Sequence, residues 1–486
     1  MLFNSYEFIF IFLPLTFFIY FFLLNKRLLV GAKGFLVFAS LFFYSWWNVA
    51  YLPIILVSML FNYVIGNSLN SNFNKVKIHK KTLLTFGIIA NLSLLGYFKY
   101  ADFFISNINI VVDANLTMLN LALPLAISFF TFQQIAYLVD SYRQETAEYD
   151  FLNYALFVTF FPQLIAGPIV HHKEMMPQFA SKYNLVKKYK NIALGIFIFS
   201  IGLFKKVVIA DTFAVWATTG FDNAESLNLI AAWATSLSYT FQLYFDFSGY
   251  TDMAIGAALL FNIKLPINFN SPYKAKDIQD FWRRWHITLS RFLRDYIYIP
   301  LGGNRVSEYR VLTNLMITFI IGGLWHGAGW TFVFWGFLHG AALVIHRIYK
   351  KLNFTMSSIL AWFITFNFIN ISWVFFRAKE FEDAIKVLSG MFGFSGIMFP
   401  KNWASTLSFL SKYQIEFGVV LQNISGKNET ISFIVLAFFT VLYFKNSMQY
   451  RDDFQTSYKN LIFTLILLLT SISMFSQVSE FLYFNF

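Results

Sequence analysis

Long apolar segments without a charged residue alternate with short basic segments along this chain. A run of roughly 20 apolar residues is long enough to cross the hydrocarbon core of a bilayer as an α-helix. Allowing for runs that hold two helices, the pattern predicts an all-α polytopic membrane protein with about ten to twelve transmembrane helices. The charge-free runs are 8–25, 34–66, 82–98, 118–139, 151–170, 191–204, 227–245, 311–345, 352–376, 430–444 and 460–479.

Interruptions within these runs predict where the helices break. The run 34–66 is long enough for two helices, with the break between Trp46 and Pro53. The run 151–170 contains FPQLIAGP at 161–168, and because proline ends a helix we expect a re-entrant element there, buried in protein or lining a cavity. The apolar segment 253–263 is too short to span the bilayer and is predicted to be re-entrant or interfacial.

Basic residues orient the predicted helices. The segments 26–33, 71–81, 173–190 and 264–310 are placed on the cytoplasmic side because loops on that side carry an excess of Lys and Arg. The first basic cluster follows the first apolar run, whereas a cleavable signal peptide carries its positive charges before that run. We therefore expect the first run to be a retained transmembrane helix.

Composition agrees with a membrane protein and excludes several kinds of site. Hydrophobic residues make up 57% of the 486 residues and charged residues only 13%, against about a quarter in soluble domains. The net charge of +12 is explained by cytoplasmic loops that meet anionic lipids, and no compact basic domain suggests nucleic-acid binding. With no cysteine, the chain has no disulfide, thiol nucleophile or cysteine zinc site, and no metal is expected.

One histidine stands in the middle of a long charge-free run. His326 lies in GGLWHGAGW at 322–330, between small and aromatic neighbours. An ionisable group inside a membrane is costly to desolvate, which favours a functional role. The alternative is a histidine that hydrogen-bonds between helices.

A second histidine lies in the most polar large segment. Apolar residues at 281, 285, 289 and 292 predict one amphipathic helix around His286. Its neighbours Arg283 and Arg284 could meet phosphates, although the residues alone favour an interfacial helix whose arginines contact lipid head groups. Upstream, Asp246 could orient an imidazole or a backbone turn, or Ser248 and Thr251 could simply cap a short helix.

The remaining histidines favour structural roles. His79 lies in a lysine-rich loop and is expected to be solvated, and His339 to pack within its helix. His171 and His172 have no carboxylate at ligand spacing, so a metal site is not expected there.

Five short motifs occur in order between residues 244 and 327. They are YFDFSGY at 244–250, NFNSPY at 268–273, FWRRWH at 281–286, RDYIYIPLGGN at 294–304 and GLWHG at 323–327. This set resembles the membrane-bound O-acyltransferase (MBOAT) family, and within it the bacterial alginate and peptidoglycan O-acetyltransferases. Trp46–Trp47, the motif at 161–168 and the tail FLYFNF at 481–486 fit as well, so that the resemblance covers nearly the whole chain.

The resemblance implies one membrane domain, a helical bundle around a central tunnel. N-terminal helices would occupy 1–150, the catalytic core 151–350, and C-terminal helices and the tail 351–486. The family's invariant tunnel histidine maps onto His326 and its second histidine onto His286, at a cytoplasmic mouth for the acyl donor. The substrate and donor site would include Asp246, Asn268, Asn270, Trp282, Arg283, Arg284, Trp285 and Trp325.

The function expected from the resemblance is acetyl transfer across a bacterial cytoplasmic (inner) membrane. Acetyl-CoA would be the donor substrate, with no bound cofactor, and a separate extracytoplasmic acetyltransferase would modify a polysaccharide, most simply peptidoglycan. His326 would be the general base, while His286 would orient the donor or polarise the thioester carbonyl. Alternatives are alginate-type acetylation, D-alanyl transfer to teichoic acid, a transporter and a purely structural scaffold. The chain lacks the paired interrupted helices typical of transporters.

The C-terminal tail offers one more candidate. Tyr483 carries the only hydroxyl of the hexapeptide 481–486. If the tail folds back into the tunnel, Tyr483 could accept the acetyl group with help from His326 and pass it to the outer partner. The alternative is an anchoring tyrosine at the membrane interface, which the general preference of tyrosine for that interface favours.

Overall fold

The computed structural model of the chain describes all residues except 71–78, 147–149, 414, 476–481 and 483–486. The α-helices are α1 (Leu13–Asn25), α2 (Leu29–Ser45), α3 (Leu52–Leu69), α4 (Lys80–Leu95), α5 (Ala101–Val112), α6 (Ile127–Tyr142), α7 (Phe151–Thr159), α8 (Phe161–Leu164), α9 (His172–Ala180), α10 (Tyr189–Phe204), α11 (Asp211–Thr218), α12 (Leu229–Leu260), α13 (Ile278–Arg284), α14 (Ile287–Leu293), α15 (Glu308–His326), α16 (Trp330–Lys351), α17 (Ser358–Arg377), α18 (Phe381–Met391), α19 (Asn428–Tyr443), α20 (Ser447–Asp452) and α21 (Tyr458–Ser473). Strands β1 (Ile397–Pro400) and β2 (Ile415–Gly418) pair in parallel, with Ile397 opposite Ile415.

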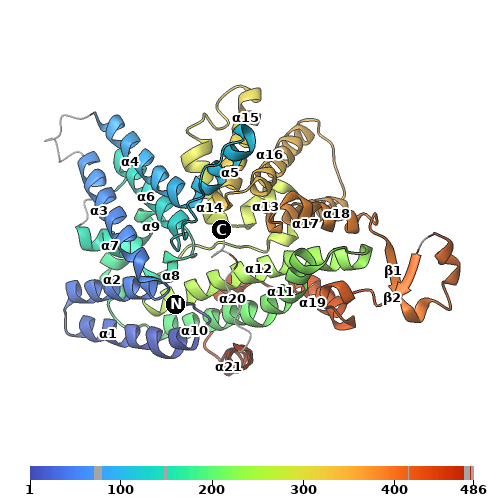
Figure 1. Cartoon of the computed structure of the whole chain (residues 1–486). Coiled ribbons are helices and arrows are strands. Elements are labelled where there is room, and N and C mark those ends of the chain that lie inside the picture. Colours follow the sequence, from blue (N-terminus) through green and yellow to red (C-terminus); the bar gives the residue numbers. More distant parts are fainter. Residues whose placement is uncertain (71–78, 147–149, 414, 476–481, 483–486) are drawn as a thin grey trace.

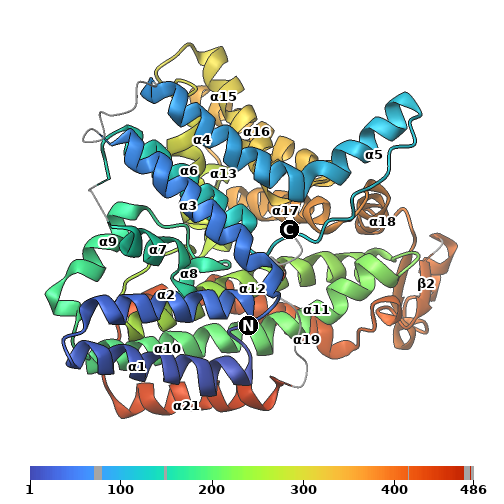
Figure 2. The same ribbon diagram turned by 60° about the vertical axis from the view of Figure 1, so that its left-hand side comes forward.

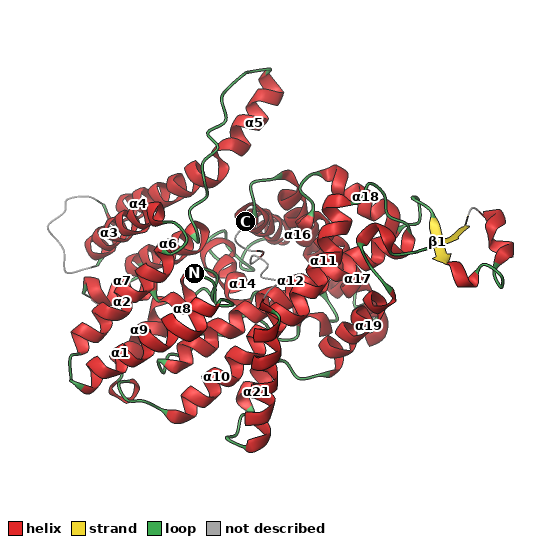
Figure 3. Cartoon of the chain, turned by 60° about the horizontal axis from the view of Figure 1, so that its bottom comes forward, coloured by secondary structure: helices red, strands yellow, loops and turns green. Residues whose placement is uncertain are grey.

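The predicted all-α membrane fold is confirmed. Six helical segments of the described chain are long and apolar enough to cross a membrane, and three shorter apolar helices accompany them. Helix α12, the longest at 32 residues, crosses the middle of the bundle, with α15 and α16 above it in Figure 1. Figure 2 shows α1, α2 and α10 together on one side of it. Helix α5 and the β1–β2 pair project from this body (Figure 3). The six segments are Glu7–Asn25, Val49–Leu69, Lys80–Val112, Tyr189–Asn223, Trp330–Lys351 and Ser358–Arg377.

Two predicted breaks are present. Between α2 and α3 the side chain of Asn48 accepts a hydrogen bond from the Ala50 amide, which starts a short 3-10 turn before Pro53 enters α3. In the 151–170 run the helix stops at Thr159, resumes for one turn in α8, and then leaves a buried irregular segment that runs to His171.

The prediction of a separate short element at 253–263 is wrong. Helix α12 continues without interruption to Leu260, although it carries Asp246 and Asp252. Lys206 pairs with Asp246 at 2.6 Å and Lys205 pairs with Asp252 at 2.7 Å. Because both carboxylates are compensated by lysines of the neighbouring helical segment, they do not end the helix.

Helices α10 and α12 touch backbone to backbone, which makes α12 the centre of the bundle. A Cβ atom on Gly202 would lie 2.5 Å from the Gly249 carbonyl oxygen, and one on Gly195 would lie 2.7 Å from that of Gly256. Small residues permit this approach in membrane helices. The contact fixes the middle of α12, and with it the ring of Phe247 that faces the candidate site.

Two of the basic segments assigned to the cytoplasm meet in space. Glu174 accepts hydrogen bonds from two guanidinium nitrogens of Arg291, at 2.5 and 3.0 Å. Gln178 forms two hydrogen bonds with the Lys264 backbone, one as donor and one as acceptor. The segments 173–190 and 264–310 therefore lie on the same side of the bundle, as their charge predicts.

Candidate active site

The structure brings the two singled-out histidines together. The rings of His286 and His326 have centroids 6.5 Å apart, and both side chains are buried. His326 is the last residue of α15, while His286 lies at the turn between α13 and α14. The ring of Phe247 from α12 packs edge-on against His286 at 4.8 Å.

His286 interrupts the helix that the sequence pattern predicts around it. The backbone of His286 has φ 43°, in the left-handed region, so that α13 ends at Arg284 and α14 starts at Ile287. Asn268 stabilises this turn, because its side-chain oxygen accepts hydrogen bonds from the Thr288 amide at 3.2 Å and from the Thr288 hydroxyl at 2.9 Å. The prediction of one continuous helix is wrong, and the break aims the His286 ring inward.

Asn268 also sets the tautomer of His286. The same Asn268 oxygen lies 3.2 Å from His286 Nδ1. An atom that accepts from the Thr288 amide is an acceptor, so that Nδ1 must donate its proton to it. In the neutral ring Nε2 then carries the lone pair, and His286 can accept a proton or a hydrogen bond at that nitrogen.

Aromatic side chains surround the ring of His326. The centroids of Trp325, Phe376 and Trp335 lie 4.9, 5.0 and 5.2 Å from that of the imidazole. Trp325, also predicted for the site, stacks on Phe132 at 5.2 Å. The base candidate therefore stands among flat apolar surfaces, as its neighbours in the sequence suggest.

The C-terminal end of α15 is capped by residues that sequence reasoning missed. Lys99 Nζ donates to the Trp325 carbonyl at 2.7 Å and to the His326 carbonyl at 3.1 Å, and the Tyr100 hydroxyl donates to the Leu324 carbonyl at 2.5 Å. The last carbonyls of a helix lack partners within it and favour a positive charge. One feature of the sequence could have revealed this role: Lys99 directly follows the apolar run 82–98, within a helical segment that continues to Val112.

Two cavities lie at opposite ends of α16, and each is lined by a residue that follows one of the two histidines in the sequence. A cavity of about 770 Å³, here called the basic cavity, is lined by Trp282 and Ile287 near His286 and by Lys350 at the end of α16. A cavity of about 300 Å³, here called the Gly327 cavity, is lined by Lys99 and Gly327 just before α16 starts. With 22 residues, α16 is about 33 Å long, close to the hydrocarbon thickness of roughly 30 Å.

The basic cavity contains one of the two adjacent arginines predicted to bind phosphate. Arg283 lines it, is exposed, and forms no ion pair within the described part of the chain. Arg284 instead pairs with Asp280 at 2.9 Å and donates to the Asn270 carbonyl. Further cations of the cavity are already paired, such as Arg347, which lies 2.7 Å from Glu308. The contacts thus favour Arg283 over Arg284 as a phosphate ligand.

Three other predicted site residues take different places. Trp282 lines the basic cavity and donates from Nε1 to His339 Nδ1 at 3.2 Å, while His339 is buried and contacts Ser372 as well. Trp285 is buried and stacks on the Phe281 ring. Asn270 is exposed, and its side chain accepts a hydrogen bond from Asn446 ahead of α20.

Asp246 lies in a buried charged cluster that reaches the end of the chain. Lys206 bridges Asp246 at 2.6 Å and Asp211 at 2.9 Å, and the other Asp246 oxygen accepts a hydrogen bond from the Leu482 amide at 3.2 Å. Asp246 therefore contacts a backbone amide and a lysine. Tyr483, the tail residue proposed as an acetyl acceptor, lies outside the described residues.

Comparison with known proteins identifies the family. The sequence profile of the membrane-bound O-acyltransferase family, MBOAT, matches residues 8–382. The chain belongs to the MBOAT family. It is 53% identical to the peptidoglycan O-acetyltransferase of Helicobacter pylori, over 100% of this chain and 98% of the relative.

More distant MBOAT relatives have other named activities. The probable alginate O-acetylase AlgI of Pseudomonas aeruginosa is 38% identical, with 92% of this chain and 82% of the relative covered. The teichoic acid D-alanyltransferase of Streptococcus thermophilus is 27% identical over 52% of this chain and 68% of its own length.

Family membership fixes the class of protein. This MBOAT chain is a multi-pass membrane acyltransferase, and its reaction consumes an acyl donor. The expectation of an enzyme is confirmed, and the transporter and scaffold alternatives are set aside.

Proposed function

We propose that this MBOAT protein is a peptidoglycan O-acetyltransferase of the bacterial cytoplasmic membrane. It moves an acetyl group from cytoplasmic acetyl-CoA to an extracytoplasmic acceptor. The observation that carries the proposal is the buried pair of His286 and His326, together with two cavities: Ile287, next to His286, lines the basic cavity, and Gly327, next to His326, lines the Gly327 cavity. The full-length similarity to a peptidoglycan O-acetyltransferase supports the choice of polymer.

The basic cavity is the proposed binding site for acetyl-CoA. Its outer part presents arginine and lysine side chains suited to phosphates, and its inner part is lined by Trp282, Ile287 and Leu293. A nucleotide held at the basic end would point its pantetheine arm along the apolar end. The thioester would then reach the side of the His286 ring.

His326 is the proposed general base. A hydroxyl is a weak nucleophile at neutral pH and needs a base that takes its proton as it attacks. The acceptor oxygen forms a bond to the acetyl carbonyl carbon, the carbon–sulfur bond breaks, and the leaving CoA thiolate recovers the proton from the His326 imidazolium. The small residues at 327–329 leave room for the acceptor on the side opposite the basic cavity.

His286 is proposed to orient the acyl donor. With Nδ1 donating to Asn268, its Nε2 accepts a hydrogen bond, for which an amide N–H of the pantetheine arm is a suitable partner. Polarising the thioester carbonyl would instead require a proton on Nε2. The donor-orienting role is therefore the one that this hydrogen bond favours.

The acceptor side is proposed to involve the C-terminal tail and an outer partner. The hydrogen bond between the Leu482 amide and Asp246 holds the residue next to Tyr483 inside the bundle. We propose that the Tyr483 hydroxyl receives the acetyl group with help from His326 and hands it to a separate extracytoplasmic transferase. Transfer that is unchanged in Tyr483→Phe would exclude this relay.

Replacement of His326 tests the proposed chemistry. His326→Ala should lower transfer of label from radioactive acetyl-CoA by about 10²–10⁴-fold, the range that general-base catalysis carries. His79→Ala, which changes an exposed histidine at the start of α4, is the control and should retain full activity. Retention of more than about a tenth of the turnover by His326→Ala would exclude His326 as the base.

A further inference from the structure

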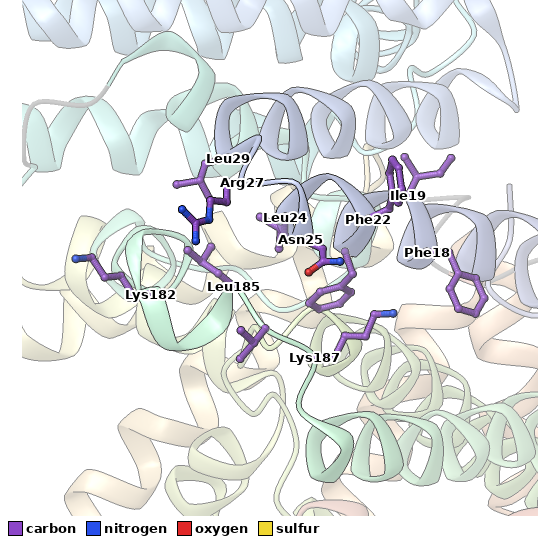
Figure 4. A pocket seen from close by; sticks show the side chains of 12 residues that line it. Phe18, Ile19, Phe22, Leu24, Asn25, Arg27, Leu29, Lys182, Leu185 and Lys187 are labelled. Carbon is purple, nitrogen blue, oxygen red and sulfur yellow. The ribbon is translucent and has the colours of Figure 1, made fainter.

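A third cavity lies apart from the histidine pair, at the C-terminal end of α1. It has a volume of about 1,370 Å³ and is formed by α1, the turn into α2 and the segment that follows α9 (Figure 4). We call it the Arg27 cavity. None of its lining residues is shared with the basic cavity or the Gly327 cavity. Its volume exceeds the roughly 300–1,000 Å³ of ordinary small-molecule sites.

One part of the Arg27 cavity is apolar and faces outward. Phe18 and Phe22, one helical turn apart on α1, are 62% and 59% exposed, and Ile19 lies beside them (Figure 4). Leu185 and Val186 line the other side of the cavity. Aromatic and aliphatic side chains at such exposure on a membrane helix are suited to acyl chains.

The other part of the Arg27 cavity is basic. Arg27 and Lys182 lie at one end of the cavity, Lys187 lies beside Phe18, and no Asp or Glu lines the cavity (Figure 4). Among the described residues none of these three cations forms an ion pair, whereas Lys173 of the same basic segment pairs with Glu145 at 2.9 Å. Three unneutralised cations beside an apolar surface match an anionic head group above its chains.

Local geometry fixes the positions of two of these cations. Lys187 Nζ lies 5.8 and 5.7 Å from the ring centroids of Phe17 and Phe18, so that its charge stays close to the apolar surface. Arg27 has φ 60° in the tight turn after α1, where the Leu28 amide donates to the Leu23 carbonyl at 3.0 Å. This turn places the Arg27 side chain at the rim of the cavity.

We propose that the Arg27 cavity binds an anionic phospholipid of the cytoplasmic leaflet. Arg27 and Lys182 contact the phosphate, Lys187 adds positive charge beside Phe18, and the acyl chains lie along Phe18 and Phe22. Both basic segments carry the charge excess of cytoplasmic loops, where anionic lipid is abundant. The bound lipid bridges α1 to the segment after α9, and the site is independent of the acetyl-transfer chemistry.

Native mass spectrometry of the purified full chain tests this site. The probes are phosphatidylglycerol and phosphatidylcholine with identical acyl chains. Wild-type protein should retain phosphatidylglycerol preferentially, and the variant R27Q/K182Q/K187Q should bind it at least about tenfold more weakly. The variant K401Q/K412Q/K427Q loses the same charge at exposed lysines elsewhere and should bind as wild type does.

Further variants keep the result interpretable. R27K/K182R/K187R preserves the charge and should retain the lipid, which assigns the loss in the glutamine variant to the removal of positive charge. Equal loss in the K401Q/K412Q/K427Q control, or unchanged binding in the R27Q/K182Q/K187Q variant, would overturn the proposal. Displacement of phosphatidylglycerol by millimolar inorganic phosphate or free CoA would also overturn it, because the site would then recognise phosphate without acyl chains.

Discussion

At the scale of single residues, the candidate site depends on polar groups that shape the backbone around each histidine. Asn268 holds the left-handed turn at His286 and fixes its tautomer through one oxygen atom. Lys99 caps the helix end that carries His326. Both act by positioning an imidazole.

Changing Asn268 to Asp should alter the pH dependence of activity. The aspartate keeps the acceptor oxygens but adds a negative charge beside His286, which favours the imidazolium. Since the lone pair on Nε2 is lost on protonation, activity should begin to fall at a higher pH as the solution is acidified. A pH–rate profile of kcat/KM against the wild type measures this. An unshifted acid limb would contradict the Asn268–His286 contact, and Asn268→Leu should lower activity at every pH.

Changing Lys99 to Met should disturb the position of His326. Loss of the ammonium leaves the Trp325 and His326 carbonyls without their cap, which costs about 1–3 kcal/mol per buried group. We expect kcat to fall about tenfold or more with little change in KM for acetyl-CoA, and Lys99→Arg to recover part of the loss. Lys81→Met, at the exposed start of α4, is the matched control. A rise in KM alone would contradict the positioning role.

At the scale of elements, the short helix α13 gives two adjacent arginines different surroundings. Arg283 points to the basic cavity, while Arg284 is held by Asp280 one turn earlier. Adjacent residues on a helix point in different directions, so that these two arginines contact different parts of the protein.

The two arginines should therefore respond differently to substitution. Arg283→Gln should raise KM for acetyl-CoA by about tenfold, as expected for a charge-assisted contact to phosphate. It should leave KM for a short acetyl thioester without the nucleotide unchanged. Arg284→Gln should affect both acyl donors alike. Equal effects of Arg283→Gln on the two donors would mean that this arginine contacts lipid or supports the fold.

At the scale of the whole molecule, α16 separates the basic cavity from the Gly327 cavity. Its N-terminal end follows the Gly327 cavity, and its C-terminal end lines the basic cavity. A helix of this length places its two ends on opposite faces of the membrane. In the proposed reaction, the acyl donor and the acceptor approach the buried histidine pair from different compartments.

The absence of cysteine allows a direct test of this arrangement. Single-cysteine variants Ala328→Cys and Lys350→Cys mark the two ends. In intact cells a membrane-impermeant maleimide should label Ala328→Cys, and it should label Lys350→Cys only after permeabilisation. The cysteine-free wild type gives the background. Labelling of both variants from outside would contradict the proposed sidedness.

The sequence by itself determined the properties that depend on local pattern. Charge-free runs of membrane length specify helices because backbone polar groups cannot remain unpaired in lipid. The break after α2 and the broken run at 151–170 follow from residues that end helices locally. The ordered motifs between 244 and 327 identified the family. His326 was predicted to be functional because burying an imidazole in a charge-free run is energetically costly.

Only the tertiary structure decided what depends on partners distant in the sequence. The helix break at His286 is stabilised by Asn268, and the continuity of α12 depends on Lys205 and Lys206, which no period-based pattern reveals. Lys99 was missed because its role is a contact with a helix more than 200 residues later. Local pattern fixes which segments become helices, because hydrogen bonds in a helix are short-range. The pairing of charges and the meeting of the two histidines are set by packing between helices.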